Sequence, residues 1–367
     1  MALSGSLTHQ ALQKFKKNFW GVFSLVFLLV CVLVAIFAYA LAPDHSQNAN
    51  QMHLSIHSQP PGFQVQMLTL PSSGTSQNAL SEFFFGIKNT QTEIPISGYN
   101  LKEDAIEITA YAPDGSKGLS KSYSLSYFPG LNAISEVPAE YISEQKFLLG
   151  TDKYGRDLLS RMLVGIRISL SIGFVAVFIS LVIGISLGAI AGYFGGKIDA
   201  AIMWLINVTW SIPTLLLVIA ITLALGKGFW QVFIAVGLTM WVEVARIVRG
   251  QVMGVKQMQY VTAAKALGYD HWRIVTQHIL PNSLAPVIII SAANFASAIL
   301  IESGLSFLGI GAQPPMPSWG GIIKDHYSYI ILGKPYLAVI PGLAIMSLVT
   351  AFMLLGNALR DVLDVKN

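Results

Sequence analysis

The feature that most constrains this chain is a series of long apolar runs with almost no charged residues. A helix needs about 20 mostly apolar residues to cross a bilayer, because its backbone polar groups must be hydrogen-bonded within the segment. Of the 367 residues, 53% are hydrophobic and only 11% are charged, whereas an ordinary soluble domain has about 25% charged residues. We therefore expect an all-α polytopic membrane protein with six transmembrane helices. The runs are Trp20 to Leu41, Ile168 to Tyr193, Ala201 to Leu225, Phe229 to Arg246, Leu284 to Gly309 and Pro335 to Leu359.

Basic residues predict how these helices are oriented. Three lysines between positions 14 and 17 precede the first run, which is too long to be the apolar part of a cleavable signal. Because short cytoplasmic loops carry the excess of Lys and Arg, we expect a cytoplasmic N-terminus and, after six crossings, a cytoplasmic C-terminus. Arg156, Arg161 and Arg167 conflict with this pattern, since they lie beside the second run on the outer side.

The polar segment between the first two runs, residues 43–147, predicts a small β-rich extracytoplasmic domain. Ile106 to Ala110 alternates apolar and polar residues, Pro113 to Ser116 supplies a turn, and Leu119 to Phe128 alternates again. This pattern predicts a β-hairpin. Further strands are expected at Val65 to Leu70 and Phe83 to Lys88.

Three segments follow from this division. Residues 1–42 hold the N-terminus and the first helix, residues 43–147 form the outer domain, and residues 148–367 form a five-helix core.

The sequence contains no recognisable motif for catalysis or for binding a cofactor or a metal ion. The single cysteine, Cys31, excludes an intrachain disulfide. The nearest approach to a phosphate-binding loop, Gly195 to Lys197, continues with Ile198 where Ser or Thr is needed, so we expect no ATP hydrolysis by this chain. His53 and His57 have a spacing that binds metal on a helix, but two prolines follow them closely, and we expect no metal site. The small net charge of +4 suits loops that orient helices and gives no reason to expect a nucleic-acid partner.

The loop of residues 250–282, between the fourth and fifth runs, predicts two short helices joined by a turn. Gln257 to Leu267 favours a helix, Gly268 supplies the left-handed residue that ends it, and Asp270 caps a second helix from His271. Such an elbow is a docking element, and the alternative is an amphipathic loop on the lipid headgroups. Its candidate contact residues are Tyr260, Ala263, Ala264, Leu267, Gly268, Trp272 and Pro281.

This loop resembles the cytoplasmic "EAA" loop of ABC importer permeases. The resemblance rests on Ala263-Ala264, on Gly268 and on Ile279-Leu280-Pro281. Two more stretches resemble the dipeptide/oligopeptide/nickel permease family: Leu149 to Arg161, before the second helix, and Glu302 to Trp319, at the end of the fifth. The spacing resembles that of the C-type permease subunit, loosely over residues 12–42 and closely over residues 148–365.

The resemblance implies a type I ABC importer permease fold in a bacterial inner membrane. It implies a transmembrane subunit of an ATP-driven importer for di- and oligopeptides or similar solutes. The implied partners are a homologous second permease, two ABC ATPase subunits that dock on the elbow, and an extracytoplasmic substrate-binding protein. Thr262 departs from the family pattern, because an acidic residue often stands there. An insertion of about 80 residues before Leu148 is a second departure.

Within the apolar runs, Glu302 is the only charged residue between Arg273 and Lys324. Intramembrane carboxylates are usually functional or paired, so Glu302 either lines the translocation path or a hinge, or is a helix-end carboxylate bonded to the loop near Trp319. Trp319 and Trp241 are further candidates for the path or hinge. Pro213 and Pro286 are expected to kink helices, and Gly184, Gly188 and Gly192 to allow close helix packing.

Two other classes of protein are possible. An ion-coupled secondary transporter acting without ATPase partners would carry more ionisable groups within its helices. A membrane sensor would need an output module, for which little chain follows the last run. The cargo itself stays open among peptides, metal chelates and glycosides.

Overall fold

A computed structural model describes residues 7–71, 78–88, 91–113, 115–116, 118–226 and 228–363. The chain divides into two compact units. A helical unit comprises Met1–Val32, Ser169–Gln313 and Leu343–Asn367, and a sheet unit comprises Leu33–Ile168 and Pro314–Gly342.

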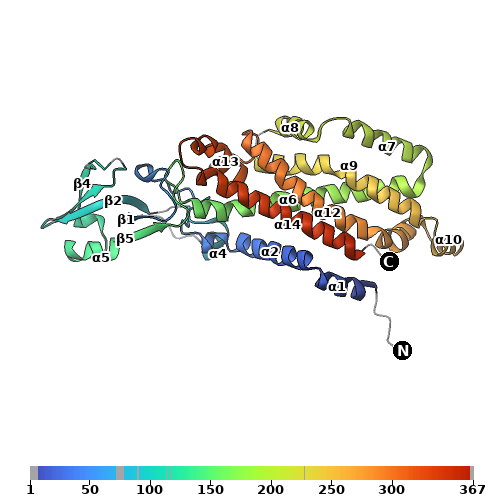
Figure 1. Ribbon diagram of the computed structural model, residues 1–367, viewed down its shortest axis with the longest axis horizontal. Coiled ribbons are helices and arrows are strands. Elements are labelled where there is room, and N and C mark those ends of the chain that lie inside the picture. Colours follow the sequence, from blue (N-terminus) through green and yellow to red (C-terminus); the bar gives the residue numbers. More distant parts are fainter. Residues whose placement is uncertain are drawn as a thin grey trace, which may run out of the picture. The chain divides into compact units, whose positions relative to one another are not determined.

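Five helices in the described part of the chain are long and apolar enough to cross a membrane. They correspond to five of the six predicted runs, and a short helix, α1 (Leu7–Lys17), precedes the first of them. The five are α2 (Phe19–Ile36), α6 (Leu158–Phe194), α9 (Phe229–Val255), α12 (Leu284–Phe307) and α14 (Tyr336–Leu363) (Figure 1).

The third predicted run is a bent pair of helices rather than one helix. Helix α7 (Gly196–Trp210) and helix α8 (Thr214–Leu225) meet at an angle of 91°. Pro213 directly precedes α8 and has no backbone N–H to continue the hydrogen bonding of α7. The predicted kink at Pro213 is therefore confirmed, and it is sharp enough to break the run.

Helix α9 is the most buried of the five candidate spans. The protein itself covers 67% of its most apolar window, against 28–39% for the other four. Helices α7, α8 and α12 all pack on it. This cover explains how α9, the least apolar of the five, carries charge. The side chain of Arg249 in α9 donates two hydrogen bonds, of 2.5 and 2.6 Å, to the carboxylate of Asp199 in α7.

Helix α6 approaches α9 closely because three glycines face it. A Cβ atom on Gly184 would lie 2.5 Å from the Cβ of Val244, and one on Gly188 would lie 2.5 Å from the carbonyl oxygen of Ala245. Gly192 meets the carbonyl oxygen of Arg249 in the same way, at 2.8 Å. The predicted close packing through small residues is confirmed.

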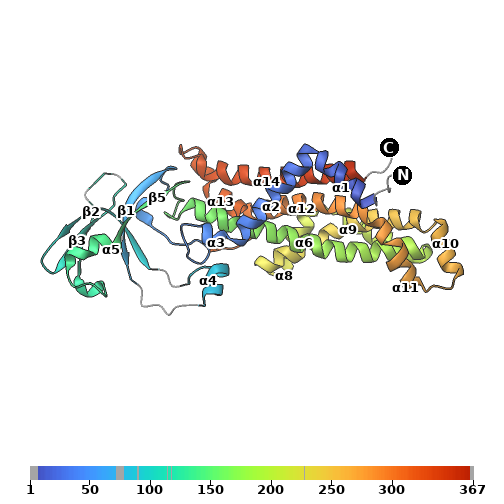
Figure 2. The same ribbon diagram turned by 90° about the horizontal axis from the view of Figure 1, so that it is seen from below.

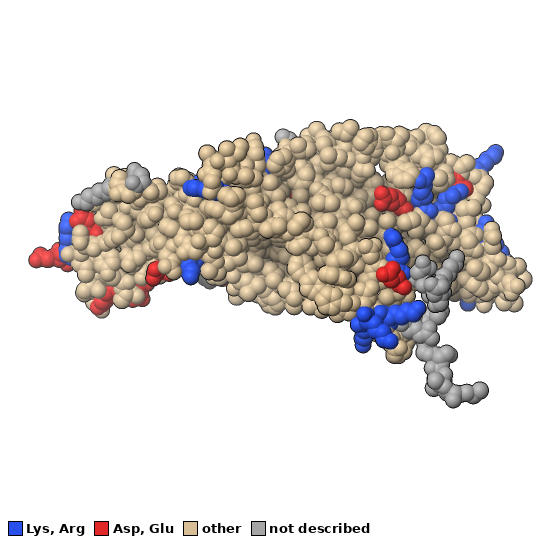
Figure 3. Space-filling view, viewed as in Figure 1, with Lys and Arg blue, Asp and Glu red and all other residues tan. Residues whose placement is uncertain are grey.

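Charged side chains avoid the flank of the helical unit. Figure 3 shows this face almost free of Lys, Arg, Asp and Glu along the spans, with charged groups gathered near α1 and toward the end that carries α10 (Gln259–Ala266). A broad apolar surface of this kind suits contact with lipid.

The sheet unit is built on five antiparallel strands in the order β4-β3-β2-β1-β5. Pairing of β3 with β4 confirms the predicted hairpin, although Asp114 of its turn lies outside the described residues. The strands are β1 (Phe63–Leu70), β2 (Thr92–Leu101), β3 (Ala105–Ala110), β4 (Ser120–Ser124) and β5 (Ile142–Phe147). Short helices α3 (Ala38–Leu41), α4 (Ala79–Phe85), α5 (Val137–Tyr141) and α13 (Trp319–His326) complete the unit.

Two details of this unit correct the sequence prediction. The strand expected over Phe83 to Lys88 is wrong, because residues up to Phe85 belong to helix α4. The ring of Phe83 packs edge-on against that of Phe37, which lies between α2 and α3, 5.7 Å away. Ile87, also in the predicted strand, forms an isolated bridge with Ser46. The alternation over Leu119 to Phe128 also ends early, since a 3-10 turn begins at Leu125.

The glycine contact between α6 and α9 predicts a sharp response to one added side chain. We expect Gly188→Val to lower stability by about 1–3 kcal/mol, because its Cβ overlaps backbone that cannot move aside. Thermal unfolding of the purified chain in detergent measures the loss. Gly304→Ala in α12 is the matched control, since its Cβ meets no atom within 4 Å; equal melting temperatures for the two variants would contradict the contact.

Candidate functional site

The elbow, residues 257–283, forms at the end of the helical unit where α6 ends and α9 leads into the loop (Figures 1 and 2). Helix α10 ends at Ala266, and Gly268, which follows its C-cap residue Leu267, has a φ of +80°. The N–H of Gly268 donates to the carbonyl of Lys265 at 3.0 Å, and the N–H of Tyr269 donates to that of Ala264 at 3.2 Å. This pair of bonds is the Schellman arrangement that ends helices at glycine, and it confirms the predicted role of Gly268.

The second arm of the elbow differs from a regular helix. Asp270 caps it as predicted, accepting a hydrogen bond from the N–H of Arg273 at 3.3 Å. Only α11 (His271–Arg273) is α-helical, and Ile274–Ile279 continues as a π-helix. The wider turn brings Ile274 and Ile279, five residues apart, onto the same buried side.

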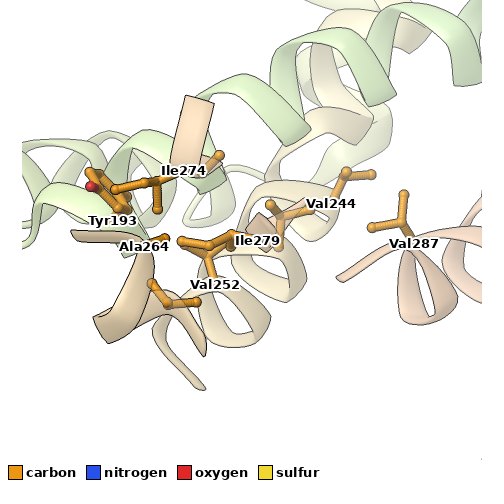
Figure 4. Close-up of a cluster of buried hydrophobic side chains, with 10 residues drawn as sticks. Tyr193, Val244, Val252, Ala264, Ile274, Ile279 and Val287 are labelled. Carbon is orange, nitrogen blue, oxygen red and sulfur yellow. The ribbon is translucent and has the colours of Figure 1, made fainter. Parts of the chain in front are cut away.

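The inner side of the elbow is packed against the rest of the helical unit. Ala264 and Val261 of α10 are buried together with Ile274 and Ile279 of the second arm. Figure 4 shows the side chains of Ala264, Ile274 and Ile279 gathered with Tyr193 of α6 and Val252 of α9. The remaining members of the cluster are Ala189, Tyr193, Val244, Val248, Val252 and Val287. The elbow and the ends of α6 and α9 thus share one close-packed interior.

Tyr193, near the end of α6, ties the two arms of the elbow to this cluster. Its hydroxyl lies 2.7 Å from Nδ1 of His271, and its carbonyl accepts a hydrogen bond from Nζ of Lys256 at 2.5 Å. The Nζ atoms of Lys256 and Lys265 lie 5.5 and 5.6 Å from the centre of its ring. Nothing in the sequence separated this tyrosine from other aromatic residues at the end of an apolar run.

The outer side of the elbow presents large apolar side chains to its surroundings. Leu267 is 73% exposed and Trp272 is 75% exposed, and Tyr260, Ala263 and Pro281 are exposed as well. Ala264 is a correction to the expected contact surface, because it faces inward and is only 4% exposed. Thr262, which replaces the usual acidic residue, is exposed beside Ala263.

Glu302 is completely buried in α12. Its Oε1 accepts a hydrogen bond of 2.6 Å from the hydroxyl of Ser306. The same hydroxyl accepts a hydrogen bond of 3.1 Å from the N–H of Ala312. Ser306 belongs to α12 itself, so this bond supports the turn that follows the helix rather than joining Glu302 to the loop near Trp319. A role of Glu302 in the translocation path or a hinge stays a prediction.

The two candidate tryptophans are also buried. Trp241 packs with Ile206 of α7 and Ala245 of α9. In the sheet unit, Nε1 of Trp319 donates to the carbonyl of Met162 at 3.0 Å, and its ring covers Gly165, where a Cβ would lie 2.8 Å away. Both side chains fix helix packing, and a role for them in translocation remains untested.

A buried charge network organises the motif before α6. The Asp152 carboxylate is inaccessible and lies 2.6 Å from Nε of Arg156 and 3.6 Å from Nε of Arg161. Arg156 also donates to the side chain of Asn50 at 2.9 Å. Removing one partner of a buried ion pair costs about 3–5 kcal/mol, so these residues, which the sequence marked only by resemblance, fix the conformation of the segment before α6.

The three arginines that conflict with the charge pattern are thus held by protein groups. Arg156 and Arg161 share the carboxylate of Asp152. Arg167 donates to the carbonyl of Phe84 at 2.6 Å and stacks over the ring of Tyr39. The positive charges of these three arginines are therefore bound by protein groups rather than by lipid headgroups, which explains why they depart from the charge pattern.

His326 is hydrogen-bonded to the segment that carries this charge network. Its Nδ1 lies 2.7 Å from the carbonyl oxygen of Ile322, which only accepts, so Nδ1 carries the proton. Its Nε2 therefore accepts the hydrogen bond of 3.1 Å from the backbone N–H of Lys153. Burial lowers the pKa of His326 below its ordinary value near 6.5, because a charged imidazole is disfavoured there.

Stability is expected to fall as the pH drops below about 6.5. The unfolded chain takes up a proton on His326 that the folded chain excludes, so acid favours unfolding, whereas at higher pH both states are neutral. His326→Gln should reduce the difference between melting temperatures measured in detergent at about pH 7.5 and pH 5.5. His9→Gln, at an exposed position, is the control; an unchanged pH dependence in His326→Gln would contradict the role of His326.

The described residues contain no group of three or more His, Cys, Asp or Glu side chains arranged to hold a metal ion. His53 instead lies 3.6 Å from the carboxylate of Glu93, and His57 follows a 3-10 turn rather than sharing a helix with His53. The candidate site is the elbow, which presents exposed apolar side chains and packs on a bundle of apolar helices. These features define the class of polytopic helical membrane proteins.

Comparison with known proteins agrees with this class. The family described as "Binding-protein-dependent transport system inner membrane component" matches residues 184–366, and the "N-terminal TM domain of oligopeptide transport permease C" matches residues 6–61. The sheet strands, from Phe63 to Phe147, lie outside both matches.

Three relatives show the extent of the likeness. The glutathione transport system permease protein GsiD of Pectobacterium atrosepticum is 41% identical over 59% of this chain and 72% of its own length. The dipeptide transport system permease protein DppC of Alkalihalophilus pseudofirmus is 42% identical over 59% of this chain and 71% of its own. The oligopeptide transport system permease protein OppC of Haemophilus influenzae is 39% identical over 64% of this chain and 75% of its own.

The chain belongs to the family of inner-membrane permease subunits of binding-protein-dependent ABC importers, and within it to the C-type permeases. It is a multi-pass membrane protein and a permease subunit, with ATP hydrolysis supplied by a separate subunit.

Proposed function

We propose that this chain is the C-type permease of an ATP-driven importer that carries di- and oligopeptides. The proposed partners are a homologous second permease, two ABC ATPase subunits and an extracytoplasmic peptide-binding protein. The observation that carries the proposal is the elbow, which exposes Leu267 and Trp272 on one side and buries Ala264 and Ile279 in the helical unit on the other. Relatives named for glutathione, dipeptides and oligopeptides support a peptide cargo.

The proposed mechanism uses the elbow as a rigid link. ATP binding draws the two ATPases together, and the docked α10 moves with its ATPase. The cluster around Tyr193 and Val252 carries this motion into α6 and α9. The packed spans then switch between the conformation open to one side of the membrane and the conformation open to the other. ATP drives the cycle only to the extent that it binds one of the two states more tightly.

The proposed topology follows from this docking. The elbow and both termini are cytoplasmic, and the sheet unit's five strands are on the opposite side of the inner membrane. Basic residues around the elbow support this orientation, among them Lys256, Lys265 and Arg273. The inserted sheet, in residues 43–147, then faces the binding protein or braces the partner permease.

Truncating the exposed anchors tests the docking surface. We expect Leu267→Ala combined with Trp272→Ala to reduce ATPase co-purification and ATP-dependent uptake at least tenfold, because exposed aromatic anchors dominate interface energies. The fold should survive, since both side chains are largely exposed. Affinity purification in mild detergent and uptake assays measure the effect.

Leu119→Ala is the matched control, because Leu119 is 87% exposed but lies beside strand β4. Unchanged ATPase binding and uptake in the double variant would reject the docking surface. Peptide uptake by the chain alone, driven by an ion gradient, would instead favour a secondary transporter.

Gly268 offers a test of coupling by backbone geometry. Nothing lies within 4 Å of a Cβ at this position, so a substitution acts through the φ of +80°. Gly268→Val should lower peptide uptake relative to ATP hydrolysis several-fold, because a β-branched residue resists that conformation, at a cost of about 1–2 kcal/mol. Gly268→Asn tolerates it better and should keep most uptake; equal uptake per ATP in both variants would exclude a coupling role for this turn.

A further inference from the structure

The helical unit contains a cavity of about 300 Å³ at the break between α7 and α8. Its walls come from both sides of the break and from the middle of α9 and α12. Its lining contains one carboxylate and three hydroxyl groups, and the other side chains are largely apolar. The lining residues are Trp210, Thr214, Thr239, Met240, Val242, Glu243, Ser297, Leu300 and Ile301.

The broken span points to a wet cavity. Trp210 ends α7 and Thr214 begins α8, and the 91° bend between them interrupts helical hydrogen bonding within an apolar run. Irregular backbone at membrane depth is tolerated where it is buried in protein or lines a water-filled cavity. Discontinuous helices also mark the substrate sites of many transporters.

Glu243 points to the same conclusion independently. It lies near the midpoint of α9 (Phe229–Val255) and is exposed, while its neighbours Val242 and Val244 are buried. Among the described residues it forms no ion pair. A carboxylate within an apolar run is usually functional or paired, and Glu243 lines the cavity.

The nearest basic residue on the same helix is already engaged. The guanidinium of Arg246 lies 4.0 Å from the centre of the Trp210 ring, over its face. This contact holds the indole as one wall of the cavity and keeps the positive charge on the aromatic ring. The carboxylate of Glu243 is thus left to face the cavity with the hydroxyl of Thr239, one turn earlier on α9.

We propose that this cavity binds cargo in transit and that Glu243 receives its ammonium group. The inference rests on the proposed peptide import, because the α-ammonium is the one cation that free peptides share whatever their side chains. The hydroxyls of Thr239, Thr214 and Ser297 supply further hydrogen-bond partners, and Leu300 and Ile301 supply apolar contact. A volume of 300 Å³ is at the lower end of ligand pockets and holds the amino-terminal part of a peptide.

Uptake by the assembled importer tests the role of the carboxylate. In proteoliposomes with ATPases and binding protein, Glu243→Gln should lower peptide uptake at least tenfold while ATP hydrolysis continues. Glu243→Asp, which keeps the charge, should retain most uptake. Wild-type uptake that Glu243→Gln leaves undiminished would overturn the inference, whereas a wild-type importer that moves no peptide would overturn the proposed function.

Thiol labelling tests the cavity without any cargo. With the native cysteine removed by Cys31→Ser, Ser297→Cys should react at least tenfold faster with a cationic methanethiosulfonate reagent than with an anionic one of similar size. Adding Glu243→Gln should abolish that preference. Ala298→Cys, at the buried neighbouring position, should stay unlabelled.

Equal rates for the two reagents at Ser297→Cys would overturn the inference, as would a preference that survives Glu243→Gln. Because this measurement needs neither ATP nor peptide, its failure is separate from failure of the proposed transport activity.

Discussion

The approach of α6 to α9 through three glycines is the contact on which the helical unit depends. Without side chains at Gly184, Gly188 and Gly192, the two backbones come close enough for the valines of α9 to fill the space between them. The same contact brings the end of α6, with Tyr193, beside Val252 of α9. The elbow packs on the platform that these two helix ends form, so the spacing of two backbones within the bundle determines where the docking surface lies.

The strands of the sheet unit pack on apolar cores, whereas the segment before α6 is organised by buried charge. Asp152 is shared by Arg156 and Arg161, and Arg156 extends the network to Asn50. Ion pairs of this kind contribute little net stability when complete, but they penalise any arrangement that leaves one partner alone. The segment before α6 is therefore held in one conformation, although it has no long helix or strand of its own.

Local signals predicted the parts of the fold that depend on local chemistry. Apolar length identified five spans, alternation identified the β3–β4 hairpin, and Gly268 and Asp270 marked the turn of the elbow. The failures have tertiary causes. A run of aromatic residues at Phe83 is compatible with a strand or a helix, and in the structure it is helical and packs against Phe37.

The candidate site shows the same limit. The inward orientation of Ala264 and the π-helix from Ile274 to Ile279 result from packing on the cluster, which no spacing in the sequence reveals. Glu243 belongs to the fourth predicted run, but its place at a cavity depends on the break at Pro213, between α7 and α8.

The break between α7 and α8 also has a consequence for how this part of the chain crosses the membrane. With 15 and 12 residues, each of these helices is shorter than the roughly 20 residues that cross a bilayer alone. Only together do α7 and α8 have the length and apolar character of a span, so neither helix can cross the hydrocarbon layer without the other.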